Sequence, residues 1–210
     1  MNPLTDVVDW LAILDSVILH STEEVIGAES TRTVFALAGL SEQRQDHRFA
    51  DKQSLFSFEK LGVLQKALEQ VYGPQAGKGL ALRIGQSSFY HLLRLRGSEL
   101  HLTDSSFRLL PLSRKLERNL DILAGLFDRI AEQCAIEVKQ TESKFIWQMS
   151  HQPFGNEKQA DSPPCYIITG LLQESLYWAS GGKIFKIAET GCMAWGDSLC
   201  TIEIDSYPIA

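Results

Sequence analysis

Helix-like and strand-like patterns occupy different parts of this chain. Apolar residues recur every three to four positions up to about residue 134, which is the spacing of a helix face. The expected helices are 4–26, 31–39, 57–72, 76–96, 112–134 and 165–179. Two-residue alternation predicts strands at 137–140, 144–149, 183–189 and 199–205. Helices first and strands later, without regular alternation, predict an α+β fold with a mainly antiparallel sheet.

The chain has the length and composition of one globular domain. It has 210 residues, 44% of them hydrophobic, enough for a full core. We expect an N-terminal helical part (1–73) and a core ligand-binding part (74–210), with polar or proline-containing loops at 41–54 and 151–164. No apolar run approaches the ~18 residues of a membrane span, and the N-terminus lacks the pattern of a signal peptide. These features predict a cytoplasmic protein.

The net charge of −6 conceals three segments of different charge. Residues 1–73 carry 6 bases and 11 acids (−5), residues 74–118 carry 8 bases and 3 acids (+5), and the rest carries −6. An acidic chain is a poor candidate for nucleic-acid binding. The basic segment 74–118 either pairs with the acidic parts of its own fold or contacts an anionic membrane surface or a protein complex.

Motifs of common enzymes are missing from the sequence. The stretch 73–79 (GPQAGKG) has three residues between its first glycines instead of four, and Gly79 stands where a phosphate loop needs Ser or Thr. No HExxH, G-x-S-x-G or strand-associated G-x-G-x-x-G occurs. The sequence therefore gives no positive sign of catalysis and favours a non-catalytic protein.

Three cysteines and a carboxylate near the C-terminus form a candidate metal site. Cys192 and Cys200 flank a Gly-Asp turn, Glu189 precedes Cys192 by three positions, and Cys165 lies upstream. Three thiolates and one carboxylate can complete a tetrahedral zinc site. Glu189 and Cys192 would point to opposite faces of a regular strand, so the site needs a bulge at 190–191. From spacing alone, zinc ligands and small buried hydrophobes both stay open.

These residues also resemble a known family, the 4-vinyl reductase domain, which shares a superfamily with subunits of the TRAPP trafficking complex. The matching positions are Cys165, Gly170, Gly182, Glu189, Cys192, Gly196, Asp197 and Cys200. The resemblance implies helices packed on a four-stranded antiparallel sheet and frequent homodimers. It also implies structural zinc bound by Cys165, Glu189, Cys192 and Cys200, and an apolar ligand pocket.

The same resemblance suggests where a ligand would bind. Aromatic-sensing members use a Trp on a strand before the first Cys, and Trp147 matches it. Their upstream His has no counterpart between His101 and His151, so a larger or more apolar ligand than phenol fits better. The candidate lining residues are Tyr90, Leu123, Phe127, Ile130, Phe145, Trp147, Met149, Tyr166 and Trp178. Each of them is also a normal core residue type.

Three classes of function follow. The favoured one is a non-catalytic, hydrocarbon-binding type of protein that holds a small hydrophobic ligand beside a structural zinc. The second is an assembly or interaction protein like the TRAPP subunits. The third is an accessory factor in chlorophyll-type tetrapyrrole metabolism or photosystem assembly. The apolar stripe of the helix over 4–26 further predicts a homodimer in which the early helices take part.

Overall fold

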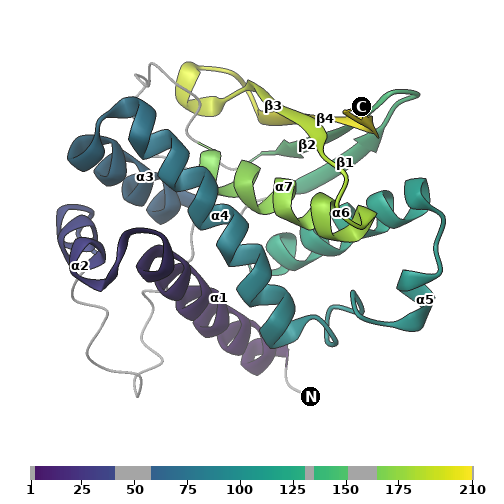
Figure 1. The fold of residues 1–210 in the computed structure, drawn as a ribbon, viewed down its shortest axis with the longest axis horizontal. Helices are drawn as coiled ribbons and strands as arrows, with labels where there is room; N and C mark the ends of the chain where they lie inside the picture. The colour runs from purple at the N-terminus through teal and green to yellow at the C-terminus, as the bar shows by residue number, and fades with distance from the viewer. Residues whose placement is uncertain (1–2, 41–57, 131–134, 151–164, 210) are drawn as a thin grey trace.

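The computed structural model describes residues 3–40, 58–130, 135–150 and 165–209, and these residues have the expected α+β fold (Figure 1). The helices are α1 (Pro3–Ile26), α2 (Ala28–Leu37), α3 (Phe58–Tyr72), α4 (Pro74–Arg96), α5 (Ser105–Arg108), α6 (Leu112–Ile130) and α7 (Tyr166–Ser180). The strands are β1 (Ile136–Gln140), β2 (Lys144–Met149), β3 (Phe185–Gly191) and β4 (Cys200–Pro208), with the 3-10 turn η2 (Met193–Trp195) before β4. The predicted loops 41–54 and 151–164, and the end of the 112–134 helix, lie outside the described residues.

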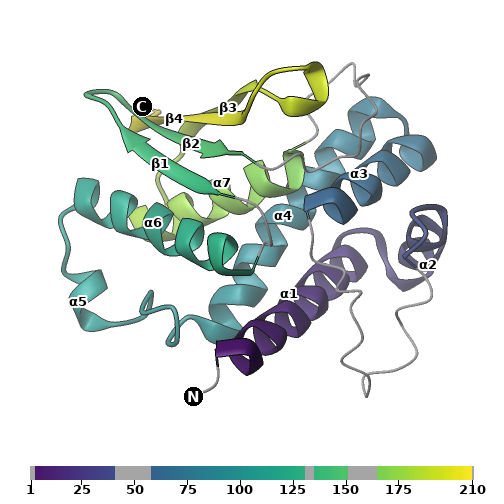
Figure 2. The same ribbon diagram turned by 180° about the vertical axis from the view of Figure 1, so that it is seen from behind.

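The four strands form one antiparallel sheet in the order β1–β2–β4–β3. Alternation along β2 places Phe145, Trp147 and Met149 on the buried face of the sheet. Helices α6 and α7 cover this face, as the two opposite views show (Figures 1 and 2). The other face is polar and carries the Lys144–Glu203 ion pair. Helices on a four-stranded antiparallel sheet are therefore confirmed.

Helices α4 and α7 cross so closely that glycine is required on both. A Cβ on Gly85 would lie 1.9 Å from the carbonyl oxygen of Ile167, and one on Gly170 would lie 2.0 Å from that of Leu82. Neither backbone carbonyl can move aside, so both positions must lack a side chain. On its other sides α4 contacts α1 and α3, so it connects the N-terminal helices to the layer that covers the sheet.

The apolar stripe of α1 is buried within the chain. Trp10, Leu14, Val17 and Ile18 are each at most 5% exposed, and α1 packs against α4. These residues therefore pack within their own fold instead of forming the predicted dimer interface. The homodimer itself stays a prediction, which light scattering can test.

The predicted helix boundaries differ from the structure mainly where one helix ends and the next begins. Helix α2 begins at Ala28, directly after Gly27, and α4 begins at Pro74, where its missing N–H costs no hydrogen bond. The single turn α5 was not expected, since four residues are too few to show a periodic pattern. None of the described helices combines the length and the apolar character that crossing a bilayer would require.

Candidate functional site

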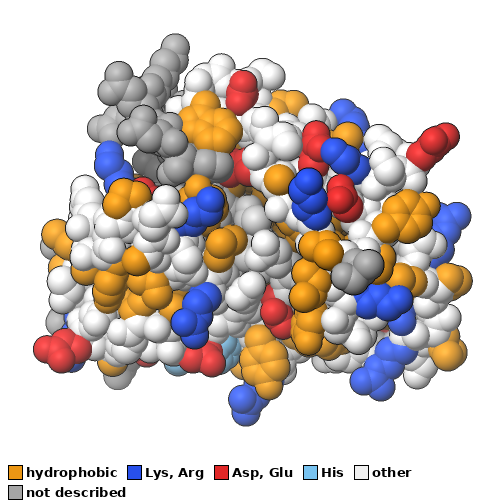
Figure 3. All heavy atoms as spheres, turned by 45° about the horizontal axis from the view of Figure 1, so that its top comes forward, with side chains coloured by type: hydrophobic (Ala, Val, Ile, Leu, Met, Phe, Trp, Pro, Cys, Tyr) orange, Lys and Arg blue, Asp and Glu red, His pale blue; other side chains and the backbone are white. Residues whose placement is uncertain are grey.

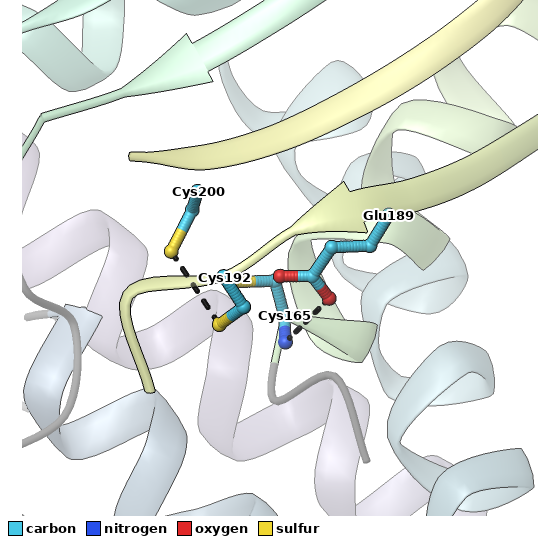
Figure 4. A group of neighbouring side chains, drawn as sticks. All are labelled: Cys165, Glu189, Cys192 and Cys200. Carbon is cyan, nitrogen blue, oxygen red and sulfur yellow. Dashed lines mark hydrogen bonds between the residues drawn. The ribbon is translucent and has the colours of Figure 1, made fainter. Parts of the chain in front are cut away.

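The four predicted metal ligands, Cys165, Glu189, Cys192 and Cys200, converge at one point under the sheet, and we call them the four-ligand cluster. Their ligand atoms all lie within 4.8 Å of one another. Cys165 precedes α7, Glu189 lies on β3, Cys192 follows β3, and Cys200 begins β4 (Figure 4). The three thiols are free and buried. Residues far apart in sequence thus meet where a helix begins beside a hairpin.

A bulge in β3 places Glu189 and Cys192 on the same side. The pairing of β3 with β4 shifts register between Glu189 and Gly191, where the sequence required it. One additional residue in a strand turns the side chains that follow it by about half a revolution. The side chain of Glu189 can then point toward the thiols, and its Oε2 accepts a hydrogen bond of 3.3 Å from the Cys165 backbone N–H.

The turn between β3 and β4 positions the two remaining thiols. Asp197 accepts a hydrogen bond of 2.8 Å from the Cys192 backbone N–H, which fixes the start of the turn. Gly196 adopts φ +99°, in the left-handed region that favours glycine. The Sγ atoms of Cys192 and Cys200 lie 3.6 Å apart, and the Met193 N–H points at the Cys200 Sγ over 3.4 Å.

Burial makes the cluster electrostatically unusual. It raises the pKa of the Glu189 carboxyl to about 8, and the neighbouring Cys192 adds to the rise. Hydrogen bonds to Cys192 and Cys200, together with burial, raise the pKa of Cys165 well above its usual range. Contacts with the other two thiols lower the pKa of Cys200 to about 4. The Oε1 atom of Glu189 is buried without a hydrogen-bond partner among the described residues. A cation at the centre would satisfy this oxygen and displace the retained protons.

The geometry of the cluster suits a four-coordinate ion. Ligand atoms around a tetrahedral ion with metal–sulfur distances of about 2.3 Å lie about 3.8 Å apart. The measured spread, from 3.6 Å for one thiol pair to 4.8 Å at most, brackets that value. All four positions would come from protein side chains, so a bound ion would have no open position for substrate and would act structurally.

Six of the predicted ligand-lining residues come together between α6 and β2, and we call them the α6–β2 interface. They are Leu123, Phe127 and Ile130 on α6 and Phe145, Trp147 and Met149 on β2. Each is at most 4% exposed. The rings of Phe127 and Trp147 meet edge to face with centroids 6.2 Å apart. This ring contact joins α6 to β2, and all six residues belong to one buried core.

The other three predicted lining residues lie elsewhere. Tyr90 is on the surface of α4 and is 58% exposed. Tyr166 is buried at the start of α7, with the Lys78 Nζ 4.7 Å from its ring centroid. Trp178 lies between Phe89 and Phe107, with ring centroids 6.0 and 5.7 Å away. Alternation and helical periodicity identified the interface residues, but neither indicates which way an isolated aromatic on another helix points.

Polar atoms inside the core were not foreseen. The Trp147 indole N–H is buried without an acceptor among the described residues. Asn119 on α6 is fully buried, and its Nδ2 donates to the Ser175 Oγ over 2.9 Å, while its Oδ1 has no partner in the described part of the chain. Asn119 interrupts a row of leucines on the apolar face of the predicted 112–134 helix. This interruption is the sequence signal for a buried polar contact.

Comparisons with known proteins identify the fold. No protein-family model and no curated protein matches this sequence. Among solved structures, an H-NOX protein from S. oneidensis in the Fe(II)NO ligation state has a TM-score of 0.55 and 15% identity, covering 90% of this chain and 96% of its own. A doubly substituted Tt H-NOX protein has a TM-score of 0.57 and 9% identity, covering 94% and 96%. The IWP-051-bound H-NOX protein from Shewanella woodyi has a TM-score of 0.51 and 15% identity, covering 93% of each chain. Identities this low show a shared fold alone.

These comparisons correct the family expected from sequence. The resemblance to the 4-vinyl reductase domain and the TRAPP subunits is wrong, because the similar structures are H-NOX proteins and no family model matches. The tetrapyrrole and TRAPP-type alternatives, which rested on that resemblance, are withdrawn with it. Cysteines, glycines and an aspartate can form the same kind of turn in unrelated folds. A short pattern of this kind therefore does not define a fold family.

The zinc cofactor is a second correction. The similar H-NOX structures are described in Fe(II) ligation states, so their metal is iron and not structural zinc. The physical reason for the error is that thiolate and carboxylate ligands do not select zinc alone, since several transition metals accept them. The positions of the four ligand residues are a separate prediction from the identity of the metal.

Proposed function

We propose that this chain is a binding module for a small hydrophobic molecule that carries one hydrogen-bond acceptor. The observation behind the proposal is the Trp147 indole N–H, which is fully buried in apolar surroundings without a partner among the described residues. An unsatisfied buried donor costs about 1–3 kcal/mol. A ligand oxygen at this position would remove that cost, while the neighbouring apolar side chains would cover the rest of the molecule.

The proposal requires the α6–β2 interface to open. Its residues are at most 4% exposed, so a molecule in solvent has no direct access to them. A ligand would enter by separating α6 from the sheet or by moving rings such as Phe127. Because of this tight packing, the proposal depends on ligand entry, which the experiment below must detect.

A matched pair of tryptophan variants tests the proposal. Native mass spectrometry of the freshly purified chain, followed by fluorescence titration with phenol, indole and lauric acid, detects a co-purified or added ligand. Trp147→Phe keeps an aromatic ring but removes the N–H, so we expect about five- to tenfold weaker binding, equivalent to one hydrogen bond of about 1 kcal/mol. The control Trp178→Phe leaves affinity unchanged, because Trp178 packs against Phe89 and Phe107 instead.

The outcome decides whether the proposal stands. Binding that depends on Trp147 supports the ligand-binding module. A protein that carries no small molecule, and whose melting temperature none of the probes raises, contradicts it.

No described histidine is placed to ligate a haem iron in the core of this chain. An axial ligand must face a buried apolar space, and histidine is a common one. The described histidines have polar partners near the surface: His20 bonds to Ser16, His91 pairs with Glu24, and His101 pairs with Asp104. The α6–β2 interface contains no histidine and is filled by its own side chains. We therefore derive no haem chemistry for this chain.

We also propose that the four-ligand cluster binds one metal ion that prefers thiolates, and that the ion fastens the start of α7 to the β3–β4 hairpin. The buried Oε1 of Glu189, unpartnered among the described residues, and the convergence within 4.8 Å support it. Cobalt(II) is a suitable probe because thiolate coordination gives intense near-ultraviolet absorption, and elemental analysis identifies the native metal. Cys192→Ser should weaken that absorption, whereas Ser198→Ala in the same turn should not. A chain that binds no cobalt and contains no metal would contradict the site.

A further inference from the structure

Residues 108–115 combine the most exposed leucine among the described residues with a local excess of positive charge. Leu109 is 84% exposed, and nearby Pro111 is exposed as well. The segment (RLLPLSRK) contains Arg108, Arg114 and Lys115 and no acid, giving +3, so the rest of the chain carries −6 − 3 = −9. In Figure 3 the right-hand end of the molecule, where α5, the start of α6 and the β1–β2 hairpin lie in Figure 1, shows Lys and Arg side chains with hydrophobic ones between them and an acidic side chain at its upper edge.

The exposure of Leu109 is imposed by its neighbours. Phe107 is buried, and its ring stacks on Trp178 with centroids 5.7 Å apart. The backbone N–H of Leu109 donates to Ser105 O over 3.1 Å, and that of Leu110 donates to Phe107 O over 3.2 Å. Helix α6 then begins at Leu112. Because the turn is anchored on both sides, Leu109 cannot fold back into the core.

We propose that the 108–115 segment docks this chain on an anionic lipid bilayer, with Leu109 inserted among the lipids and the three bases near the headgroups. A bilayer accepts a single apolar side chain without a complementary pocket, and basic residues beside it strengthen the contact with anionic lipids. A protein partner would instead need about 800 Å² of complementary surface, which a protruding turn does not offer.

The charge distribution also fixes the orientation. The rest of the chain carries a net −9, so repulsion favours the orientation in which this segment faces an anionic surface. Beside the segment lies a groove of about 670 Å³ whose lining includes three carboxylates and the bases Arg114 and Arg118. Arg114 pairs with Glu117 over 2.8 Å, so Arg108 and Lys115 are the bases of the segment on which the contact mainly depends. No described helix is able to span the bilayer, so the proposed attachment is peripheral.

Sedimentation with lipid vesicles tests the proposal on the full chain. We expect binding to vesicles of equal parts phosphatidylcholine and phosphatidylglycerol, little binding to phosphatidylcholine alone, and release by high salt. Arg108→Gln with Lys115→Gln should weaken binding about 25-fold, taking about fivefold for each base. Leu109→Ser should weaken it further, and Leu37→Ser, which changes a 57%-exposed leucine on α2, should not. Thermal unfolding verifies that each variant is folded.

Three results would overturn the proposal. The first is no binding to the anionic vesicles, and the second is equal binding by Leu109→Ser and the unaltered chain. The third is retention on immobilised polyglutamate, lost in the double Gln variant, without vesicle binding. That result would assign the segment to an acidic protein partner.

Discussion

The four-ligand cluster and the α6–β2 interface are neighbours beneath one sheet, since Met149 of the interface pairs in register with Cys200 of the cluster. In the interface, six apolar side chains are packed to at most 4% exposure around an indole N–H that has no partner among the described residues. In the cluster, three thiols and a carboxylate are gathered where burial raises the pKa of Glu189 to about 8. The interface is held by apolar packing, whereas the proposed cation would stabilise the cluster by replacing its protons.

This difference shows that burial has two separate causes in the same core. Apolar side chains are buried because water is excluded from them, which needs no partner beyond close packing. Ionisable side chains are buried at a cost unless each is paired, hydrogen-bonded or bound to a metal. The stability of the two regions should therefore respond differently to chelation, to pH and to substitution.

The largest expected effect is that of Cys200→Ser in the metal-loaded chain. Removing one of four ligands should lower the free energy of unfolding on the order of 4 kcal/mol, because metal binding is coupled to folding. With a chelator present, the same substitution should cost only about 1 kcal/mol. Urea unfolding under both conditions measures the difference, and Ser198→Ala is the control. Equal losses with and without chelator would show that the cluster holds no metal.

An effect of similar size is expected for Phe127→Ala in the α6–β2 interface. The substitution leaves a cavity facing Trp147 and should lower the free energy of unfolding by about 3–5 kcal/mol. Chelation should not change this loss, since no interface residue is a ligand. A loss under about 1 kcal/mol would indicate that the interface is loosely packed, which would support a pocket already open to ligand.

The pH dependence of the metal-free chain should show the cost of the buried carboxyl. The folded-state pKa of Glu189, about 8, lies above its ordinary value of 4.5, so the folded chain binds this proton more tightly than the unfolded chain. The Glu189 contribution to stability should therefore fall as pH rises from about 4.5 to 8, by on the order of 2 kcal/mol once partial exposure is considered. The lowered pKa of Cys200 acts in the opposite direction over this range, so the Glu189 contribution is read as the difference between the unaltered chain and Glu189→Gln.

In the metal-loaded chain, stability should instead rise with pH. The ligands bind the ion in their deprotonated forms, so the affinity of the cluster for the metal rises with pH. Glu189→Gln has no proton to lose, so the Glu189 contribution should be absent from its metal-free profile. Chemical unfolding at a series of pH values, with and without chelator, provides the comparison. Identical metal-free slopes in the two chains would assign the slope to another group.

The sequence predicted local structure better than it predicted spatial arrangement. The bulge near Gly191 could be inferred because Glu189 and Cys192 cannot share a face of a regular strand. Alternation in 144–149 identified the buried face of β2 for the same kind of reason. In contrast, the Gly85–Gly170 crossing of α4 and α7 joins segments far apart in the chain, and no local pattern records which helices touch.

The site was predictable only as a set of ligand residues. The convergence of Cys165 with the hairpin followed from ligand chemistry, but the family and the zinc did not, because short motifs fit several folds and thiolates accept several metals. Tyr90 was expected in the pocket because it is aromatic, yet the crossing of α4 turns it toward solvent. Asn119 was overlooked because its partner, Ser175, lies on a different helix.

The smallest expected effect concerns the intrinsic helix stability of α6, which can be tested separately from its packing on β2. Gly125 is exposed within α6, and a Cβ added there would meet nothing within 4 Å. Gly125→Ala should raise the free energy of unfolding by about 0.5–1 kcal/mol, because alanine loses less backbone entropy in a helix. The gain should be the same with and without chelator, since the substitution touches neither region. Gly85→Ala is the opposing control, because its Cβ would collide with Ile167 and destabilise the fold. If Gly125→Ala lowered stability instead, α6 would have to be packed against something at its exposed face, in addition to α7 and the sheet on its buried side.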